Sequence, residues 1–133
     1  MEHRFVFFDM AVQHVTRAAR VFRQPGKHLH MVGVGGTGKA TVAQLAAFIE
    51  DCFFFRPFVS RTYNLLEFRD DLKKASIRAG VKGDNTVIFL TDNLVKVSGF
   101  LLHISWVLES PTKVYMILTV GEALCFKWLM LQP

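Results

Sequence analysis

Apolar residues along the chain fall into two alternating patterns: continuous runs, and positions spaced three or four residues apart. The continuous runs predict strands at residues 28–34, 52–59, 86–91 and 114–120, with a further short β-prone segment at residues 4–8. The spaced positions predict helices at residues 9–22, 38–50, 65–79 and 98–110. Strands that alternate with helices in this way indicate an α/β fold with a mainly parallel sheet flanked by helices.

Local signals mark the ends and the inner faces of these helices. Asp9 is expected to cap the first helix, and Gln24-Pro25-Gly26 to end it. Asn64 and Glu67 have the spacing of a capping box, and Gly80 is placed for the C-cap of the same helix. The helix at residues 38–50 is expected to bury Val42, Leu45, Ala46 and Ile49. The helix at residues 98–110 is expected to bury Phe100, Leu101, Ile104, Val107 and Leu108.

The composition indicates a folded domain with much apolar surface. The chain of 133 residues corresponds to about one domain, and 51% hydrophobic with 20% charged residues excludes a disordered chain. Thirteen Phe residues and a mean hydropathy of +0.28 are expected for a piece of a larger protein. The rest of such a protein would cover the apolar surface of the piece. The apolar stretch at residues 114–131 contains Glu122 and Lys127 and is short for a bilayer, so no membrane-spanning helix is predicted.

The charge balance narrows the classes of partner. Sixteen Lys and Arg against eleven Asp and Glu give a net charge of +5, which suits phosphate-bearing partners. The basic residues are spread along the chain and do not interleave with Phe53–Phe55, so neither nucleic acid nor membrane is an expected partner. Cys52 and Cys125 form no CxxC pattern, which argues against a zinc ribbon or a disulfide scaffold and indicates a reducing compartment such as the cytoplasm.

A glycine-rich loop follows the first long strand. The pattern GxxxxGK of a phosphate-binding P-loop is matched by Gly33-Val34-Gly35-Gly36-Thr37-Gly38-Lys39. Glycines allow consecutive backbone N–H groups to turn inward around a phosphate, and the helix that follows directs its positive end to the same place. Lys39 is expected to reach the outer phosphates as a point charge.

The loop lacks the last member of the pattern, a Ser or Thr hydroxyl directly after the lysine that binds Mg²⁺. Ala40 stands there, and Thr41 follows about 100° further round the helix. Thr41 is therefore the candidate hydroxyl for the metal, with a water molecule between.

Asp92 ends the apolar run at residues 86–91 and fits a Walker B aspartate, which holds Mg²⁺ directly or through water. A strand-end aspartate can also simply begin a turn, but its occurrence together with a P-loop favours the metal role. Hydrolysis in this class also calls for a glutamate beside the aspartate, and the next residue is Asn93. The sequence therefore predicts nucleotide binding more strongly than hydrolysis, and no catalytic residue is assigned.

Two further groups of side chains have weaker functional interpretations. His28 and His30 share one face of a predicted strand and could both ligate a metal, but no third ligand accompanies them, so ordinary strand residues are favoured. Arg17, Arg20 and Arg23 share one helix face, which is either solvated or a contact with another subunit or module.

A family resemblance rests on residues 8–17, 23–25, 33–41, 45–49, 68–74, 79–82 and 89–93. Together these segments resemble the fourth AAA+ module of dynein heavy chains, of axonemal rather than cytoplasmic type. The loop is the most distinctive part, because that module also replaces the residue after the lysine and has a hydroxyl one step later, as in Ala40-Thr41. The resemblance covers about residues 5–110.

The resemblance implies a P-loop NTPase of the AAA+ class, of which this chain holds the large subdomain. Gly33–Thr41 would then be the ATP-binding loop, with Lys39 on the phosphates and Asp92 as the Walker B acid. It implies ATP or ADP with Mg²⁺ at a site that regulates the motor ring rather than driving its main stroke. The implied partners are the adjacent AAA+ modules, and microtubules only through parts of a heavy chain missing here. The implied location is the cytoskeleton of the cilium or axoneme.

The resemblance stops near residue 110. Leu102 stands where the family usually has an acidic residue, and nothing from Pro111 onward matches. We therefore expect a partial AAA+ module at residues 1–110 and a divergent apolar tail at residues 111–133, in a truncated piece whose subdomain is incomplete at its C-terminus. In this fold class a further strand lies between the P-loop strand and the Walker B strand. Our hypothesis is that residues 114–120 fill that gap, which would place Thr119 near the phosphates.

Three functional hypotheses follow from these residues. The first is an ATP-binding AAA+ module derived from a dynein heavy chain, with weak or no hydrolysis. The second is an inert structural fragment that needs neighbouring modules to fold and binds nothing alone. The third, a small P-loop kinase or nucleic-acid ATPase, would need a catalytic base or an acceptor pocket that the sequence does not show.

Overall fold

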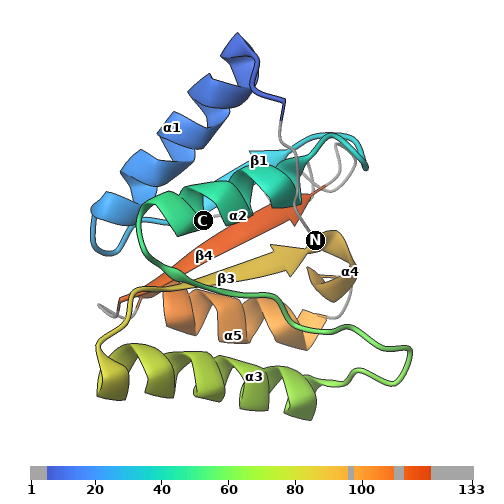
Figure 1. The fold of residues 1–133 in the computed structure, drawn as a ribbon. Helices are drawn as coiled ribbons and strands as arrows, with labels where there is room; N and C mark the ends of the chain where they lie inside the picture. Colours follow the sequence, from blue (N-terminus) through green and yellow to red (C-terminus); the bar gives the residue numbers. More distant parts are fainter. Residues whose placement is uncertain (1–5, 96–97, 110–112, 121–133) are drawn as a thin grey trace.

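The chain forms a parallel β-sheet with helices on both faces, and the computed structural model describes residues 6–95, 98–109 and 113–120. The strands are β1 (Leu29–Val32), β2 (Phe53–Phe55), β3 (Thr86–Thr91) and β4 (Val114–Val120). The helices are α1 (Asp9–Arg23), α2 (Lys39–Ile49), α3 (Leu65–Ile77), the short α4 (Asp92–Val95) and α5 (Ser98–Glu109). Figure 1 shows α1 and α2 over one face of the sheet and α3 and α5 over the other. The predicted α/β fold is confirmed.

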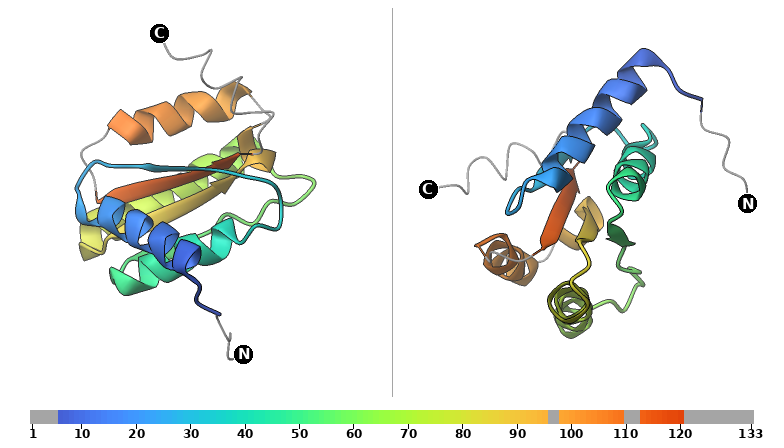
Figure 2. Two further views of the ribbon diagram at one scale, coloured as in Figure 1. Left: turned by 90° about the horizontal axis from the view of Figure 1, so that it is seen from above. Right: turned by 60° about the vertical axis from the view of Figure 1, so that its left-hand side comes forward.

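The order of strands in the sheet is β1-β4-β3-β2, and every pair is parallel. The last strand in sequence, β4, thus lies between β1 and β3, with Ile117 opposite Leu29 on one side and Phe89 on the other. This confirms the hypothesis that residues 114–120 fill the gap between the P-loop strand and the strand that leads to Asp92. Viewed from above, β4 and β3 run side by side (Figure 2).

Each face of the sheet has its own hydrophobic core. Alternate residues of β3 point to opposite faces, so Ile88 and Leu90 belong to one core while Val87 and Phe89 belong to the other. Because both faces are covered, β3 and β4 are apolar almost throughout rather than alternating. On the α3 and α5 face, the closest pair of rings among the described residues is Phe68 and Phe100, whose centroids are 4.8 Å apart.

Two of the four predicted helix-end signals need correction, whereas α1 ends at Arg23, with Gln24 as its C-cap, as predicted. The capping box is confirmed, because the Glu67 N–H donates to Asn64 Oδ1 at 3.0 Å and the Asn64 N–H donates to Glu67 Oε2 at 3.1 Å. Asp9 is instead the first helical residue of α1, and its N-cap is Phe8, without a side-chain hydrogen bond. Gly80 does not end α3, since a π-helical turn continues the chain to Lys82 and Gly83, at φ +74°, ends it.

The inner face of α2 also differs from the predicted stripe. The buried residues are Ala43, Ala46 and Ala47, whereas Ile49 is 53% exposed. The helix packs beside α1 on the same face of the sheet, and small side chains on its contact faces allow this close approach. In α5, Phe100 and Ile104 are buried as predicted, and the side chains of residues 101, 107 and 108 lie outside the described ones.

The predicted strands at residues 4–8 and 52–59 are shortened or absent. Residues 6–8 form no strand, and residues 4 and 5 lie outside the described part of the chain. Strand β2 ends at Phe55, because Pro57 two positions later has no N–H to extend the ladder. Within the described residues, no helix is both long and apolar enough to cross a bilayer.

Candidate functional site

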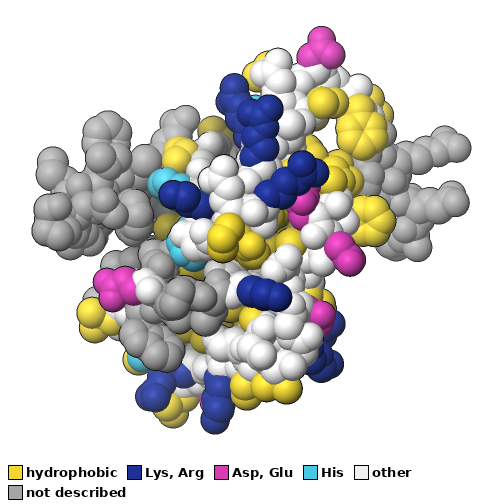
Figure 3. All heavy atoms as spheres, turned by 90° about the vertical axis from the view of Figure 1, so that its left-hand side faces the viewer, with side chains coloured by type: hydrophobic (Ala, Val, Ile, Leu, Met, Phe, Trp, Pro, Cys, Tyr) yellow, Lys and Arg dark blue, Asp and Glu magenta, His cyan; other side chains and the backbone are white. Residues whose placement is uncertain are grey.

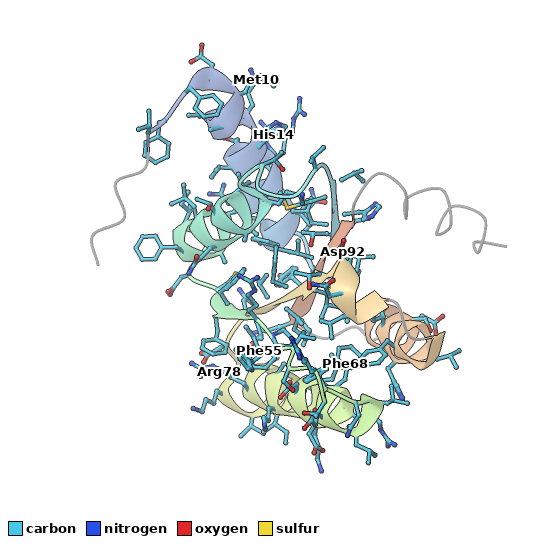
Figure 4. All side chains as sticks on the ribbon, turned by 90° about the vertical axis from the view of Figure 1, so that its right-hand side faces the viewer. Met10, His14, Phe55, Phe68, Arg78 and Asp92 are labelled. Atoms are coloured by element: carbon cyan, nitrogen blue, oxygen red, sulfur yellow. The ribbon has the colours of Figure 1, made fainter. Side chains whose placement is uncertain are left out.

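A cleft of about 470 Å³ opens at the carboxyl ends of the parallel strands, where the glycine loop, β3 and β4 meet. It is lined by Gly33, Gly35, Gly36, Thr37, Gly38, Lys39, Ala40, Arg56, Phe89, Thr91, Asp92 and Thr119. Open parallel α/β sheets bind their ligands at this edge, because loops and helix N-termini converge there. Figure 4 looks onto this edge, where Asp92 lies.

The loop between β1 and α2 has a backbone shape that requires glycine. Gly36 and Gly38 have φ values of +81° and +80°, in the left-handed region that other residues rarely adopt. Gly38 is also the N-cap of α2, so the unpaired N–H groups of the first helical turn point towards the cleft. The Thr37 hydroxyl donates to the carbonyl oxygen of Val34 at 2.8 Å and closes the loop. This arrangement presents a concave row of donors at the positive end of a helix.

Lys39 lies at the centre of the loop. Its Nζ donates to the carbonyl oxygens of Gly33 and Val34, both at 2.7 Å, and lies 3.4 Å from Thr37 Oγ1. The side chain therefore bridges the start of the loop and the start of α2, and its charge is held among the residues that line the cleft.

The opposite wall of the cleft is formed by the ends of β3 and β4. Asp92 is the first residue of α4, directly after β3, and its side chain is half-buried. Thr119, 5% exposed, donates its hydroxyl proton to the carbonyl oxygen of Leu90 at 3.1 Å and so ties the ends of the two strands together. The expected position of Thr119, near the phosphate loop, agrees with its place in the cleft lining.

Three of the residues singled out from the sequence do not line the cleft. Val34 is 63% exposed, and Thr41 is exposed on the first turn of α2 beyond Ala40, which does line the cleft. Asn93 is exposed and stands outside the lining as well. Thr41 as a metal ligand therefore stays a prediction that requires a bridging water molecule.

Arg56 and Phe89 line the cleft but were not found from the sequence. The guanidinium carbon of Arg56 lies 5.7 Å from the centre of the Phe89 ring. A usable signal existed for Arg56, because it follows the aromatic run Phe53–Phe55 just as Asp92 follows its own apolar run, and carboxyl ends of parallel strands share one edge. The strand was predicted to extend to residue 59, so Arg56 was placed in its middle and not at its carboxyl end.

The two histidines take no part in the cleft. His28 Nδ1 accepts a hydrogen bond from the backbone N–H of Met116 at 3.1 Å, which joins the start of β1 to β4. Burial lowers the pKa of His30 below its ordinary value. Among the described residues, no group of three or more His, Cys, Asp or Glu could hold a metal ion. These observations agree with the favoured interpretation of both as strand residues.

The arginines of α1 form an exposed basic face. Figure 3 shows Lys and Arg side chains gathered over this helix on one side of the molecule. Arg23 is the member with an ion pair, since its Nε lies 2.9 Å from both carboxylate oxygens of Glu50 at the end of α2. Arg17 instead lines a second hollow of about 460 Å³ between α1 and β1, which borders the glycine loop at Gly33, Thr37 and Lys39.

Together, the parallel sheet order, the glycine loop at a helix N-terminus and the strand-end aspartate define a P-loop NTPase fold of the AAA+ class. The family described as "P-loop containing dynein motor region D4" matches residues 4–122. The chain belongs to this family.

Individual relatives agree with the family. The chain is 41% identical over 109 residues to human dynein axonemal heavy chain 6, which covers 82% of the chain and 3% of that relative. It is 39% identical over 105 residues to human dynein axonemal heavy chain 10, and 37% identical over 105 residues to the dynein beta chain of the flagellar outer arm of Chlamydomonas reinhardtii. Each of these two matches covers 79% of the chain and 2% of the relative. The chain thus spans only a few per cent of the length of the dynein heavy chains that it matches.

Proposed function

We propose that this chain is an ATP-binding AAA+ module that corresponds to the fourth module of a dynein heavy chain. The observation that carries the proposal is that the glycines of the loop, Lys39 and Asp92 line one cleft at the carboxyl edge of a parallel sheet. The ligand is ATP or ADP with Mg²⁺.

The loop supplies the phosphate contacts. Its inward N–H groups and the positive end of α2 favour a polyanion, and Lys39 adds a full charge at the same point. Lys39 now donates to two carbonyl oxygens of its own loop, so phosphate binding exchanges these neutral acceptors for charged ones. Hydrogen bonds to charged oxygens are the stronger ones, which gives the exchange its direction.

Asp92 would hold the magnesium ion that accompanies the nucleotide. Carboxylate oxygen is the ligand type that Mg²⁺ prefers, and Asp92 is the acidic residue in the lining of the cleft. Bound magnesium offsets the negative charge of the phosphates. Thr41 would contribute its hydroxyl through a water molecule.

Hydrolysis is proposed to be weak or absent. A water molecule that attacks the terminal phosphate needs a base or an orienting group, and the residue after Asp92 is Asn93, exposed and outside the lining. A site that binds nucleotide and turns it over slowly suits a regulatory role in a motor ring better than the main stroke.

The setting of the module is proposed from its relatives. Their names place them in axonemes and in the flagellar outer arm. We accordingly propose the ciliary cytoskeleton as location and adjacent AAA+ modules as partners, with microtubules contacted only through other parts of a heavy chain. The exposed basic face of α1 at Arg17 and Arg20 is a suitable contact for a neighbouring module.

The direct test is thermal unfolding of the 133-residue chain with and without millimolar Mg-ATP. At about a hundred times the dissociation constant, the ligand should add about 2.7 kcal/mol to the free energy of unfolding, a rise in melting temperature on the order of 10 °C. The Lys39→Ala chain should lose this rise, because it lacks the charge at the centre of the loop. Phosphate release in the same samples should be no faster with the wild-type chain than with Lys39→Ala.

Lys73→Ala is the matched control, since Lys73 is exposed on α3 and lies outside the cleft lining. It should keep the full rise in melting temperature. A rise of equal size in the Lys39→Ala chain would contradict the proposal. A wild-type chain that unfolds cooperatively but gains nothing from Mg-ATP would favour the alternative of an inert structural fragment.

The metal role of Asp92 has its own test, the dependence of ATP affinity on Mg²⁺. The increase in ATP affinity that Mg²⁺ causes should be about tenfold smaller for Asp92→Asn than for the wild-type chain, because the neutral amide replaces a charged ligand of the ion. Titration calorimetry with ATP, in Mg²⁺ and in EDTA, measures this for the variant and for Asp70→Asn, an exposed residue of α3 outside the cleft lining. Equal magnesium dependence in the Asp92→Asn and wild-type chains would exclude the assignment.

A further inference from the structure

We propose that Arg56 binds the terminal phosphate of the nucleotide and makes the cleft prefer a nucleoside triphosphate over a diphosphate. The inference rests on the proposed nucleotide site and adds a second cation to it. Arg56 lines the cleft together with Lys39 and Asp92, and comes from a different strand end than either.

The register of β2 against β3 places Arg56 on the face of the sheet that carries the glycine loop. Phe54 lies opposite Val87 and Phe55 opposite Ile88, so the next step puts Arg56 beside Phe89. Val87 and Phe89 both point into the core beneath α1 and α2. The contact of 5.7 Å between the Arg56 guanidinium and the Phe89 ring agrees with this step.

The backbone around Arg56 is restrained. Pro57 follows it, and a residue before proline is held to extended conformations because the proline ring excludes the helical region. Pro57 is itself buried, which anchors the segment where it leaves the sheet. The arginine side chain therefore starts from a defined point at the carboxyl edge of the sheet.

The N–H groups of the Arg56 guanidinium are available to bind a ligand. Lys39 already donates to Gly33 and Val34, whereas Arg56 forms no hydrogen bond or ion pair with any residue in the described part of the chain. It lies over the ring of Phe89, and this cation–π contact leaves its edge of N–H groups without a hydrogen-bond partner among the described residues. Such an edge matches phosphate oxygens in a bidentate manner.

The strand order indicates which phosphate Arg56 would meet. The glycine loop follows β1 and Arg56 follows β2, and these are the two outer strands of the sheet. The loop and Arg56 thus enter the cleft from opposite sides, with Thr119 and Asp92 between them. A terminal phosphate that extends beyond the loop meets the carboxylate of Asp92, and Arg56 is the cation on that side of the lining that offsets the repulsion.

The test compares the affinities of the 133-residue chain for Mg-ATP and Mg-ADP by titration calorimetry. Arg56→Gln is expected to weaken ATP binding by about tenfold and to change ADP binding by less than about twofold, since one set of charge-assisted hydrogen bonds is lost from the terminal phosphate only. Arg61→Gln is the matched control, because it removes the same charge from an exposed arginine of the same loop outside the cleft lining. It should leave the ratio of the two affinities unchanged.

Arg56→Lys provides a second variant should Arg56→Gln unfold. It keeps the charge but loses the bidentate edge, so its preference for ATP should fall between those of the wild-type and glutamine chains. Equal loss of ATP and ADP affinity, or no loss of either, would overturn the role of Arg56 while leaving the nucleotide site in place. A wild-type chain that binds neither nucleotide would overturn the site and the inference together.

Discussion

Replacing Ile117 by asparagine is expected to cost the chain about 4 kcal/mol or more of its free energy of unfolding. Ile117 is fully buried at the centre of β4, between Leu29 of β1 and Phe89 of β3. The substitution removes a buried aliphatic side chain and buries an amide without partners in the core beneath α1 and α2. A chain of this length is stable by roughly 7 to 20 kcal/mol, so the melting temperature should fall by many degrees.

Val32→Asn is the control for this prediction, measured by thermal unfolding under circular dichroism. Val32 lies on the outer strand β1 and is 48% exposed, so its replacement should cost less than about 1 kcal/mol. Two variants that unfold at the same temperature would show that β4 is not an inner strand of the sheet. The same comparison bears on the predicted division at residue 110, because a tail apart from the module would tolerate Ile117→Asn.

Phe68→Ala is expected to lower the free energy of unfolding by about 3 to 5 kcal/mol. Phe68 on α3 is fully buried, and its ring lies 4.8 Å from that of Phe100 on α5, so it joins both helices to the sheet. Truncation leaves a cavity that the closely packed neighbours cannot refill. Figure 4 shows Phe68 on the side of α3 that faces the sheet.

Urea denaturation of Phe68→Ala and of Leu66→Ala measures this difference. Leu66 is 67% exposed on the same helix, and its truncation should change stability by less than about 0.5 kcal/mol, since little apolar surface is lost. Phe68→Leu should recover part of the loss by filling some of the cavity. Equal midpoints for the two alanine variants would mean that the α3 core does not hold the fold together.

The features that were predicted correctly from the sequence are determined by residues close together in the chain. The strand at residues 86–91 has the bounds predicted, because an apolar run of six residues followed by aspartate has few other ways to be buried. The capping box of Asn64 and Glu67 closes within one helical turn. The glycine loop is likewise local, and Gly36 and Gly38 have the positive φ that the pattern requires.

The elements that were mistaken depend on contacts between distant residues. Gly80 was expected to end α3, but the π-helical turn buries Ala79 in the core and moves the end to Gly83. Ile49 was expected inside, but α2 packs beside α1 on one face of the sheet and turns its alanines to their common core, which leaves Ile49 53% exposed. Neither packing partner can be identified from residues close by in the chain.

The sequence alone indicated the kind of chemistry that we propose for this protein. The glycine pattern, the lysine and the strand-end aspartate are chemical requirements of phosphate and metal binding, and each is visible within a few residues. Tertiary structure decided which side chains share the cleft. Only the parallel order β1-β4-β3-β2 brings Lys39, Thr119, Asp92 and Arg56 to one edge, because their separations in sequence are closed by strand pairing and not by local geometry.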